Sequence, residues 1–236
     1  MKKRWIAVGI GAGLLAAGVV GAQAGTPRPP AVDPGNFTSP VANPYFPLEP
    51  GTVSVLRGQD QGQRFFERFK VTADTKVIQG VTNTVILDRL WEDGYLAEVT
   101  YDWYAADNDG NVWYFGEDTA TYDEKGNVLS RHGSWEAGVD GAVAGIIMPA
   151  DPRPTDAYRQ EFYAGEAEDQ AWIVQNHASK TVPYGHLDQL VRSFEWARLE
   201  KKVMVEKLFA PGLGLVYEEA IAGSVESLEL VKVITP

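Results

Sequence analysis

The residues best suited to chemistry lie in one acidic and aromatic segment, residues 92–140. It holds twelve acidic side chains against two basic ones, Lys125 and Arg131, with three tryptophans and five tyrosines interleaved. Carboxylates among aromatic side chains must extend into solvent, bind cations or share protons in pairs, because an isolated buried charge is costly. This segment is therefore where a functional site is predicted.

Alternation of side chains places several of these carboxylates on one face of a predicted strand over residues 95–105. Its odd-numbered positions form the predicted core face, and its even-numbered positions carry Glu98, Asp102 and Tyr104. A two-residue Asp-Gly turn then folds the chain back so that Asp102 lies opposite Glu117. A four-residue turn changes the register but keeps these carboxylates on the same face. Like charges in opposed pairs repel, so the arrangement needs a physical explanation.

A second predicted hairpin, which turns at residues 125–126, returns a cation and an imidazole towards the same strands. Arg131 and His132 then lie close to Glu117 and Asp118. The predicted cluster therefore combines carboxylates from two strands with one histidine and one arginine.

Three interpretations of this cluster stay open. The first is a solvated acidic face that Arg131 partly neutralises. The second is a Ca²⁺ site, because calcium prefers oxygen ligands. Its candidate ligands are Glu98, Asp102, Glu117 and Asp118. The third is a catalytic pair, Asp102 and Glu117, that acts as general acid and base on a glycan. The candidate ligand-binding residues are Tyr104, Trp113, Trp135 and His132.

Two turns repeat the pattern Asp-x-x-Gly-Asn-Val, at residues 107–112 and 123–128. We interpret them as two consecutive hairpins with the same turn chemistry, because a true repeat architecture needs three or more units. A calcium-binding turn built from Asp107, Asp109 and Asn111 is the alternative. No other cofactor is predicted, since the chain has no phosphate-binding glycine loop and no paired His-Glu zinc motif.

The N-terminal residues are typical of an export signal. Lys2, Lys3 and Arg4 precede an apolar run over residues 5–20, and Ala22-Gln23-Ala24 fits a cleavage site. Residues 1–24 are therefore predicted to be a cleaved signal peptide. The chain contains no cysteine, so thiol catalysis and disulfides are excluded. The predicted location is the bacterial periplasm or the extracellular medium.

The charge balance narrows the choice of partners. The formal net charge is −11, and removal of three basic signal residues makes it −14. Nucleic acid is not an expected partner, because phosphate binding requires a basic surface, and an anionic membrane surface is disfavoured for the same reason. A small-molecule, lipid or glycan ligand is expected instead, with no integral membrane span after signal cleavage.

The remaining chain reads as a single all-β domain. Residues 25–44 are a proline-rich linker or arm, and residues 45–236 show period-two alternation with frequent turn dipeptides. Locally joined strands of this kind predict an antiparallel meander that closes as a half-barrel, a barrel or a sandwich. A long loop is expected near residues 137–157, with at most one short helix, near residues 164–172.

Two end segments resemble those of uncharacterised secreted bacterial β-rich proteins. Residues 43–52 (NPYFPLEPGT) are similar to their opening, and residues 208–216 (LFAPGLGLV) are similar to their closing hairpin. The resemblance implies a curved antiparallel sheet, like the half-barrel of periplasmic lipoprotein carriers, and it implies no activity. Together these features predict an exported binding protein with a concave, acidic and aromatic face, for which Ca²⁺ is one candidate cofactor and no other is predicted. A glycan hydrolase and an envelope structural or interaction protein are the alternatives.

Overall fold

The computed structural model describes residues 31–236, so the predicted signal peptide lies outside the described residues. They form one short 3-10 helix and fifteen strands. Their bounds are η1 (Pro34–Phe37), β1 (Val53–Asp60), β2 (Gln63–Ile78), β3 (Val81–Glu92), β4 (Tyr95–Ala106), β5 (Val112–Tyr122), β6 (Val128–Ser130), β7 (Trp135–Glu136), β8 (Val143–Met148), β9 (Ala157–Arg159), β10 (Glu161–Phe162), β11 (Asp169–Val182), β12 (Gly185–Ala197), β13 (Met204–Ala210), β14 (Gly214–Ala222) and β15 (Ser227–Ile234).

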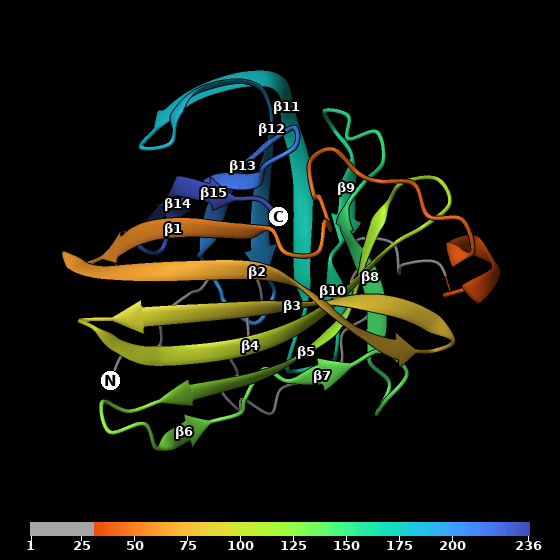
Figure 1. Cartoon of the computed structure of the whole chain (residues 1–236), viewed down its shortest axis with the longest axis horizontal. Coiled ribbons are helices and arrows are strands. Elements are labelled where there is room, and N and C mark those ends of the chain that lie inside the picture. The colour runs from red at the N-terminus through yellow and green to blue at the C-terminus, as the bar shows by residue number, and fades with distance from the viewer. Residues whose placement is uncertain (1–30) are drawn as a thin grey trace.

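The strands form a single antiparallel sheet that is nearly closed as a barrel (Figure 1). Its order is β10-β8-β5-β4-β3-β2-β1-β15-β14-β13-β12-β11-β9, and β6 and β7 pair with β5. The seam lies where β8 and β10 meet β9 and β11. There the backbone N–H of Gln160 donates to the carbonyl of Asp169 at 2.9 Å. The predicted all-β meander is confirmed, and of the three predicted closures the barrel is the one that forms.

Side-chain alternation fills the barrel with two hydrophobic clusters. One contains Ile86, Phe115 and Met148, and the other contains Leu190 and Leu208. All five side chains are fully buried. In β2 the inward positions are Phe65, Glu67, Phe69 and Val71, so a single charged residue shares a face with three apolar ones.

The described part of the proline-rich segment packs against the barrel as an arm. Phe37 meets the rings of Trp113 and Phe115 edge-on, with centroids 5.8 Å apart in both cases. The buried Asn43 side chain donates to the carbonyls of Gly110 and Pro149 at 2.8 and 2.9 Å. The arm therefore covers one end of β5 and the adjoining turns.

One of two expectations about local structure is wrong. The predicted loop near residues 137–157 contains β8, which pairs with β5 and β10. All six residues of β8 are apolar or glycine, without polar alternation, so period-two patterning does not reveal this strand. The expectation of at most one short helix is confirmed, and residues 164–172 form a turn followed by β11. Gly165 adopts a positive φ of 82° there, and Tyr163 forms a bridge with Ala167.

The two repeated turns use the same hydrogen bonds, which confirms the hairpin interpretation. Asp107 Oδ1 accepts the backbone N–H groups of Asp109 and Asn111, and Asp123 Oδ1 accepts those of Lys125 and Asn127. Asp107 Oδ2 also accepts side-chain N–H groups from Asn111 and Trp113 at 2.8 and 2.9 Å. Four N–H donors thus surround this carboxylate, which leaves it little capacity to coordinate calcium.

Candidate functional site

The predicted register between β4 and β5 is confirmed at its centre. Asp102 pairs with Glu117, and Thr100 pairs with Thr119. A bulge between Asp102 and Tyr104 then shifts the register, so that Tyr104 lies opposite Tyr114 instead of Phe115. The bulge places the Tyr104 and Tyr114 rings in a stack with centroids 4.6 Å apart.

The predicted assignment of faces is wrong, because the acidic face of β4 turns into the barrel. Asp102 and Tyr104 are 0% exposed, whereas Tyr101 on the predicted core face is 43% exposed. The outer face tolerates its aromatic residues because other side chains cover them, as Lys76 Nζ covers the Trp103 ring at 3.3 Å. A solvated acidic face is therefore wrong for Asp102 and Glu117, which is 3% exposed.

One hydroxyl group lies between the two opposed carboxyls. Tyr114 Oη lies 2.8 Å from Asp102 Oδ1 and 3.0 Å from Glu117 Oε2. A hydroxyl has a single hydrogen to donate, so it can satisfy one of the two carboxylates at a time. The other carboxyl must carry a proton of its own or stay unneutralised in the interior. This geometry is that of carboxyls that share a proton, instead of extending into solvent or binding a cation.

The electrostatics of the interior agree with proton sharing. Burial raises the pKa of Asp102 well above its usual value, against the opposing hydrogen bond from Tyr114. Burial, followed by the charge of Asp102, raises the pKa of Glu117 in the same way. Burial also raises the pKa of Glu98 to about 7. These carboxyls therefore keep their protons to a higher pH than ordinary carboxyls do.

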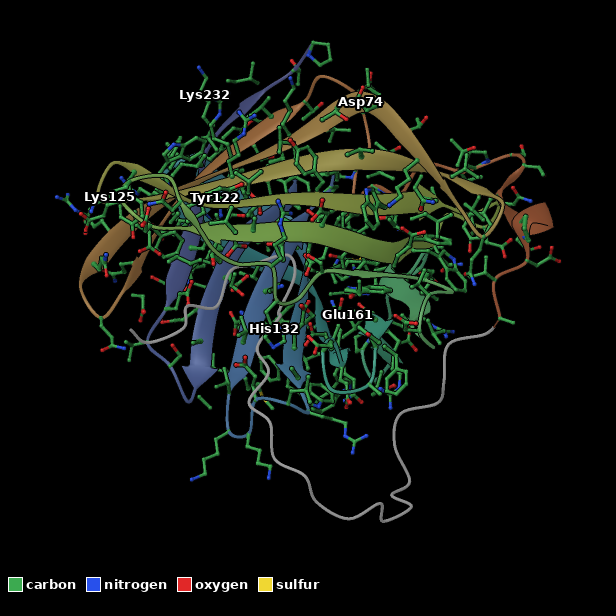
Figure 2. All side chains as sticks on the ribbon, turned by 90° about the horizontal axis from the view of Figure 1, so that it is seen from below. Asp74, Tyr122, Lys125, His132, Glu161 and Lys232 are labelled. Atoms are coloured by element: carbon green, nitrogen blue, oxygen red, sulfur yellow. The ribbon has the colours of Figure 1, made fainter. Side chains whose placement is uncertain are left out.

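Two further pairs of carboxyls lie inside the barrel. Glu67 on β2 neighbours Asp88 on β3, and burial and then the charge of Asp88 raise the pKa of Glu67. Glu161 on β10 neighbours Asp169 on β11 at the seam, and burial and then the charge of Asp169 raise the pKa of Glu161. Figure 2 shows Glu161 between the walls of the barrel. Buried carboxyls therefore lie on both sides of the group formed by Asp102, Glu117 and Tyr114.

On the wall of the barrel formed by β12, β13 and β14, a buried lysine compensates the charge of two glutamates. Lys207 Nζ on β13 lies 3.0 Å from Glu195 Oε2 on β12 and 3.7 Å from Glu218 Oε2 on β14. Burial lowers the pKa of Lys207, but the charges of both glutamates outweigh burial and raise it overall. Burial raises the pKa of Glu218 to about 7, although Lys207 opposes that rise. The lysine therefore stays charged while one of its partners titrates near neutrality.

A cavity of about 50 Å³ lies beside Glu67 of the first pair and the Lys207–Glu195 ion pair. Its polar lining is Thr52, Ser54, Glu67, Gln160, Glu195 and Lys207. Its apolar lining is Phe46, Pro47, Leu56, Phe69, Val71, Ile147, Phe209, Leu213 and Leu215. A mostly apolar cavity with a few convergent polar groups is typical of small-molecule sites. The volume is enough for about three or four water molecules.

Glu67 is the most unusual group in this cavity. Its side chain is 1% exposed, and within the described residues neither carboxyl oxygen accepts a hydrogen bond from an N–H or O–H donor. Glu67 shares a proton with its neighbour Asp88, because their side-chain interaction raises the pKa of Glu67 and opposes the rise in the pKa of Asp88, so Glu67 donates to Asp88 and its own oxygens still lack a donor. A buried acceptor without a donor is costly, so Glu67 is the position at which a bound donor gains most.

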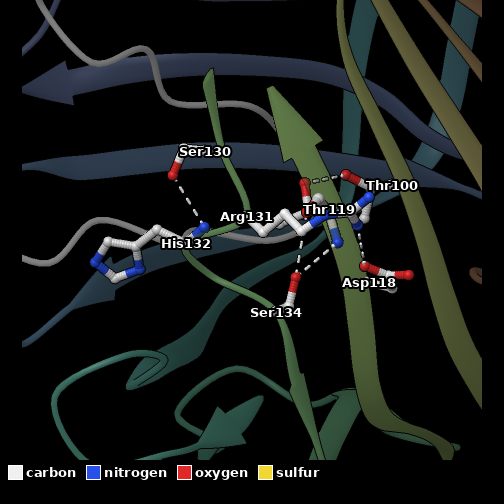
Figure 3. Close-up of polar contacts among 7 residues, drawn as sticks. All are labelled: Thr100, Asp118, Thr119, Ser130, Arg131, His132 and Ser134. Atoms are coloured by element: carbon white, nitrogen blue, oxygen red, sulfur yellow. Dashed lines mark hydrogen bonds and ion pairs between the residues drawn. The ribbon is translucent and has the colours of Figure 1, made fainter. Parts of the chain in front are cut away.

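The structure does not bring all the predicted metal ligands together. Asp118 lies on the outer face of β5, where Arg131 donates to its Oδ1 at 3.1 Å (Figure 3). Alternation along β5 separates it from the inward Glu117. Across residues 31–236, no three histidine, aspartate or glutamate side chains are arranged to hold a metal ion. A Ca²⁺ site stays a prediction without structural support.

The predicted ligand-binding residues are dispersed. His132 points away from Thr100 and Thr119 (Figure 3) and pairs with Glu166 at 2.7 Å. Trp113 is covered by Phe37 of the arm. Tyr104 and Trp135 are both buried, and each packs against Tyr114, at 4.6 and 5.3 Å. None of the four lines the cavity, and their predicted binding role is untested.

Several cavity residues were missed in the sequence although a signal for them is present. Glu67 lies between Phe65 and Phe69, and Lys207 lies between Val205 and Phe209, at spacings of two. A single charged side chain on an otherwise apolar strand face predicts a buried, functional or paired group. These isolated positions are a weaker signal in the sequence than the dense acidic segment of residues 92–140.

Two solved structures resemble the chain. One is a candidate exported protein with a YmcC-like fold from Bacteroides fragilis, with 11% sequence identity and a TM-score of 0.49. The other is a candidate lipoprotein from Parabacteroides distasonis, with 13% identity and a TM-score of 0.45. Each likeness covers 82% of this chain and 100% of the other. Both TM-scores are below 0.5, so these likenesses assign neither a family nor an activity.

No protein-family model and no curated protein matches the sequence. The sequence resemblance to secreted bacterial β-rich proteins therefore stays a prediction. No helix within residues 31–236 has the length and apolar character needed to cross a membrane.

Proposed function

We propose that this is an exported binding protein that takes the donor-bearing end of a small amphiphilic molecule into the barrel cavity. The observation that carries the proposal is Glu67, a buried carboxyl at the cavity with no donor to either oxygen among the described residues. An ammonium or hydroxyl group of a ligand would supply that donor. Export is supported by the predicted signal peptide.

The walls of the cavity favour an apolar body attached to this polar end. Phe46, Phe69 and Phe209 line it together with Leu213 and Leu215. Burial of an apolar surface stabilises a complex by about 25 cal/mol for each Å² removed from water. Lys207 faces the cavity but is already paired with Glu195, so it is not free to bind an anionic head group, and the Glu67 carboxyl gives such a group no cation to pair with. A cationic or neutral head group is therefore favoured over an anionic one.

Catalysis by Asp102 and Glu117 is not favoured by their placement. Both carboxyls are buried and neither lines the cavity, so a glycan bound there does not reach them. Their bond to Tyr114 also holds them as a structural group. Of the two carboxyls that line the cavity, Glu67 shares a proton with Asp88 and Glu195 is paired with Lys207, so the pair predicted to be catalytic is not the one at the cavity.

The test is a calorimetric titration of the purified exported protein with three probes of equal chain length: hexylamine, hexanol and hexanoate. We expect the amine to bind most tightly and the carboxylate most weakly. Glu67→Gln should weaken hexylamine binding about tenfold or more, because a hydrogen bond to a charged group contributes about 1.5–3 kcal/mol. Glu124→Gln, at an exposed hairpin position, is the matched control.

The control should bind like the wild type. The proposal is wrong if none of the three probes binds in a saturable manner, or if Glu67→Gln and Glu124→Gln bind hexylamine equally well. Adding calcium or a chelator to the same titrations tests whether a cation takes part in binding.

A further inference from the structure

The outer face of β15, β1, β2 and β3 carries six exposed basic side chains and fewer acidic ones, among them Asp74 and Glu229, in a protein of net charge −11. Its exposed basic side chains are Arg57, Arg64, Arg68, Lys70, Arg89 and Lys232. We call this set the basic face. Register places Arg57 opposite Phe66, Arg68 opposite Val55 and Arg89, and Lys232 opposite Val55. Figure 2 shows Lys232 projecting from the outside of the barrel.

Most cations of the basic face form no ion pair with the residues that the structure describes. Arg68 and Arg89 are direct cross-strand neighbours, and like charges in that relation destabilise a sheet. Among the described residues, neither forms an ion pair, and Arg57 has only a 3.9 Å contact with Glu229. A surface shaped by stability alone would alternate charges here. The arrangement therefore indicates an external anionic partner.

Aromatic and aliphatic side chains lie between the cations. The rings of Phe66 and Trp91 pack with centroids 5.3 Å apart, and Phe66 is 37% exposed. Tyr101 is exposed two strands from Lys70, next to Leu87. Arginine, lysine, tryptophan and tyrosine side chains are the ones that favour the interface between a bilayer and water. The basic face therefore offers both charge and interfacial aromatic residues.

We propose that the basic face docks the protein on an anionic lipid bilayer. The face is the outside wall of a barrel (Figure 1), so it curves away from a bound polymer such as a glycan instead of enclosing it. It can lie on an extended surface, where each lysine or arginine gains from the negative surface potential. The negative net charge does not oppose this contact, because much of the acid is inside the barrel, at residues such as Asp102, Glu117 and Glu161.

The test is vesicle flotation of the purified exported protein. One set of vesicles contains phosphatidylcholine alone, and the other contains three parts in ten of phosphatidylglycerol. Arg68→Gln/Arg89→Gln removes two cations from the basic face. Lys125→Gln/Lys201→Gln removes two exposed cations elsewhere, so the two variants have the same net charge. Arg64→Gln/Lys70→Gln provides a second variant of the same face.

The wild type should float with the anionic vesicles and not with the neutral ones, and its binding should fall between 50 and 300 mM salt. Each basic-face variant should bind about 30-fold more weakly, which corresponds to about 1 kcal/mol for each cation lost. The Lys125/Lys201 variant should bind like the wild type.

Equal flotation of all four proteins would overturn the proposal. Binding to a soluble anionic polysaccharide without binding to anionic vesicles would also overturn it, as would concentration-dependent self-association through the basic face. These outcomes are independent of the cavity, because none of the substituted residues lines it.

Discussion

At Tyr114, one hydroxyl serves two buried carboxyls, Asp102 and Glu117. Replacing Tyr114 with phenylalanine removes this hydroxyl, so neither carboxyl keeps the hydrogen bond to it. Tyr114→Phe should lower the free energy of unfolding by about 1–3 kcal/mol, the cost of an unsatisfied buried polar group. Tyr122→Phe, at the partly exposed end of the same strand, should change it by less than about 0.5 kcal/mol. Urea denaturation of both variants at pH 7 measures the difference, and equal values would contradict the proton-sharing arrangement.

Without a bound cation, a negative charge on Asp102 destabilises the folded protein, because it repels the opposed carboxyl of Glu117. Asp102→Asn keeps an acceptor for Tyr114 and removes one of two opposed carboxyls. It should therefore stabilise the protein by about 0.5–2 kcal/mol at pH 7.5, with the same result in calcium and in chelator. Asp118→Asn, on the outer face, should change stability by about 0–1 kcal/mol. If calcium raises the melting temperature of the wild type but not of Asp102→Asn, a cation site replaces proton sharing.

Glu98 makes folding stability depend on pH. Its pKa is raised to about 7 in the folded protein, against about 4.3 in an unfolded chain. The folded state therefore binds the proton more tightly, so this contribution to stability is fully present below about pH 4 and is lost as the pH rises through 7. In the wild type, the free energy of unfolding should decrease between pH 5 and 8. Glu98→Gln should reduce that decrease by about 2 kcal/mol, measured by urea denaturation. A wild-type protein whose stability rises over that range, or a variant with an unchanged slope, would contradict this prediction.

At the scale of elements, the seam depends on a close approach of backbones. A Cβ atom on Gly145 of β8 would lie 2.5 Å from the carbonyl oxygen of Gln160 and 2.6 Å from that of Arg159. Gly145→Ala should therefore push the seam open and lower the free energy of unfolding by about 1–3 kcal/mol. Ala73→Val, at an exposed position of β2, adds apolar atoms without such a clash and should change it by less than about 0.5 kcal/mol. Faster proteolysis near the seam in Gly145→Ala alone would support this role.

Alternation along the sequence predicted the strands and the partners of Asp102, but not which face of β4 turns inward. Both faces carry aromatic side chains, and the deciding factor is non-local, because Tyr114 reaches Asp102 only through the bulge between β4 and β5. Similarly, β8 shows no period-two alternation of polar and apolar residues, so the sequence predicts a loop at this position. The seam that it closes requires contacts with β10, which local sequence does not reveal.

At the scale of the whole molecule, charge is segregated by surface. Carboxyls such as Glu67, Asp88 and Asp102 lie inside the barrel, while Arg68 and Arg89 are exposed on its outside. The net charge of −11 therefore describes neither the interior nor the basic face. The N-terminal signal pattern and the period-two alternation predict an exported, all-β chain, but the two candidate binding surfaces depend on how the sheet closes.

The central claim is that Glu67 receives a donor from a ligand in the cavity, and a crystal structure of the protein soaked with hexylamine tests it most directly. The account predicts the amine nitrogen within hydrogen-bonding distance of a Glu67 oxygen, about 2.7–3.2 Å, with the alkyl chain along Phe69 and Phe209. Crystals of Glu67→Gln soaked in the same way should show a weaker occupancy. An empty cavity, or hexylamine bound at another site, would contradict the account.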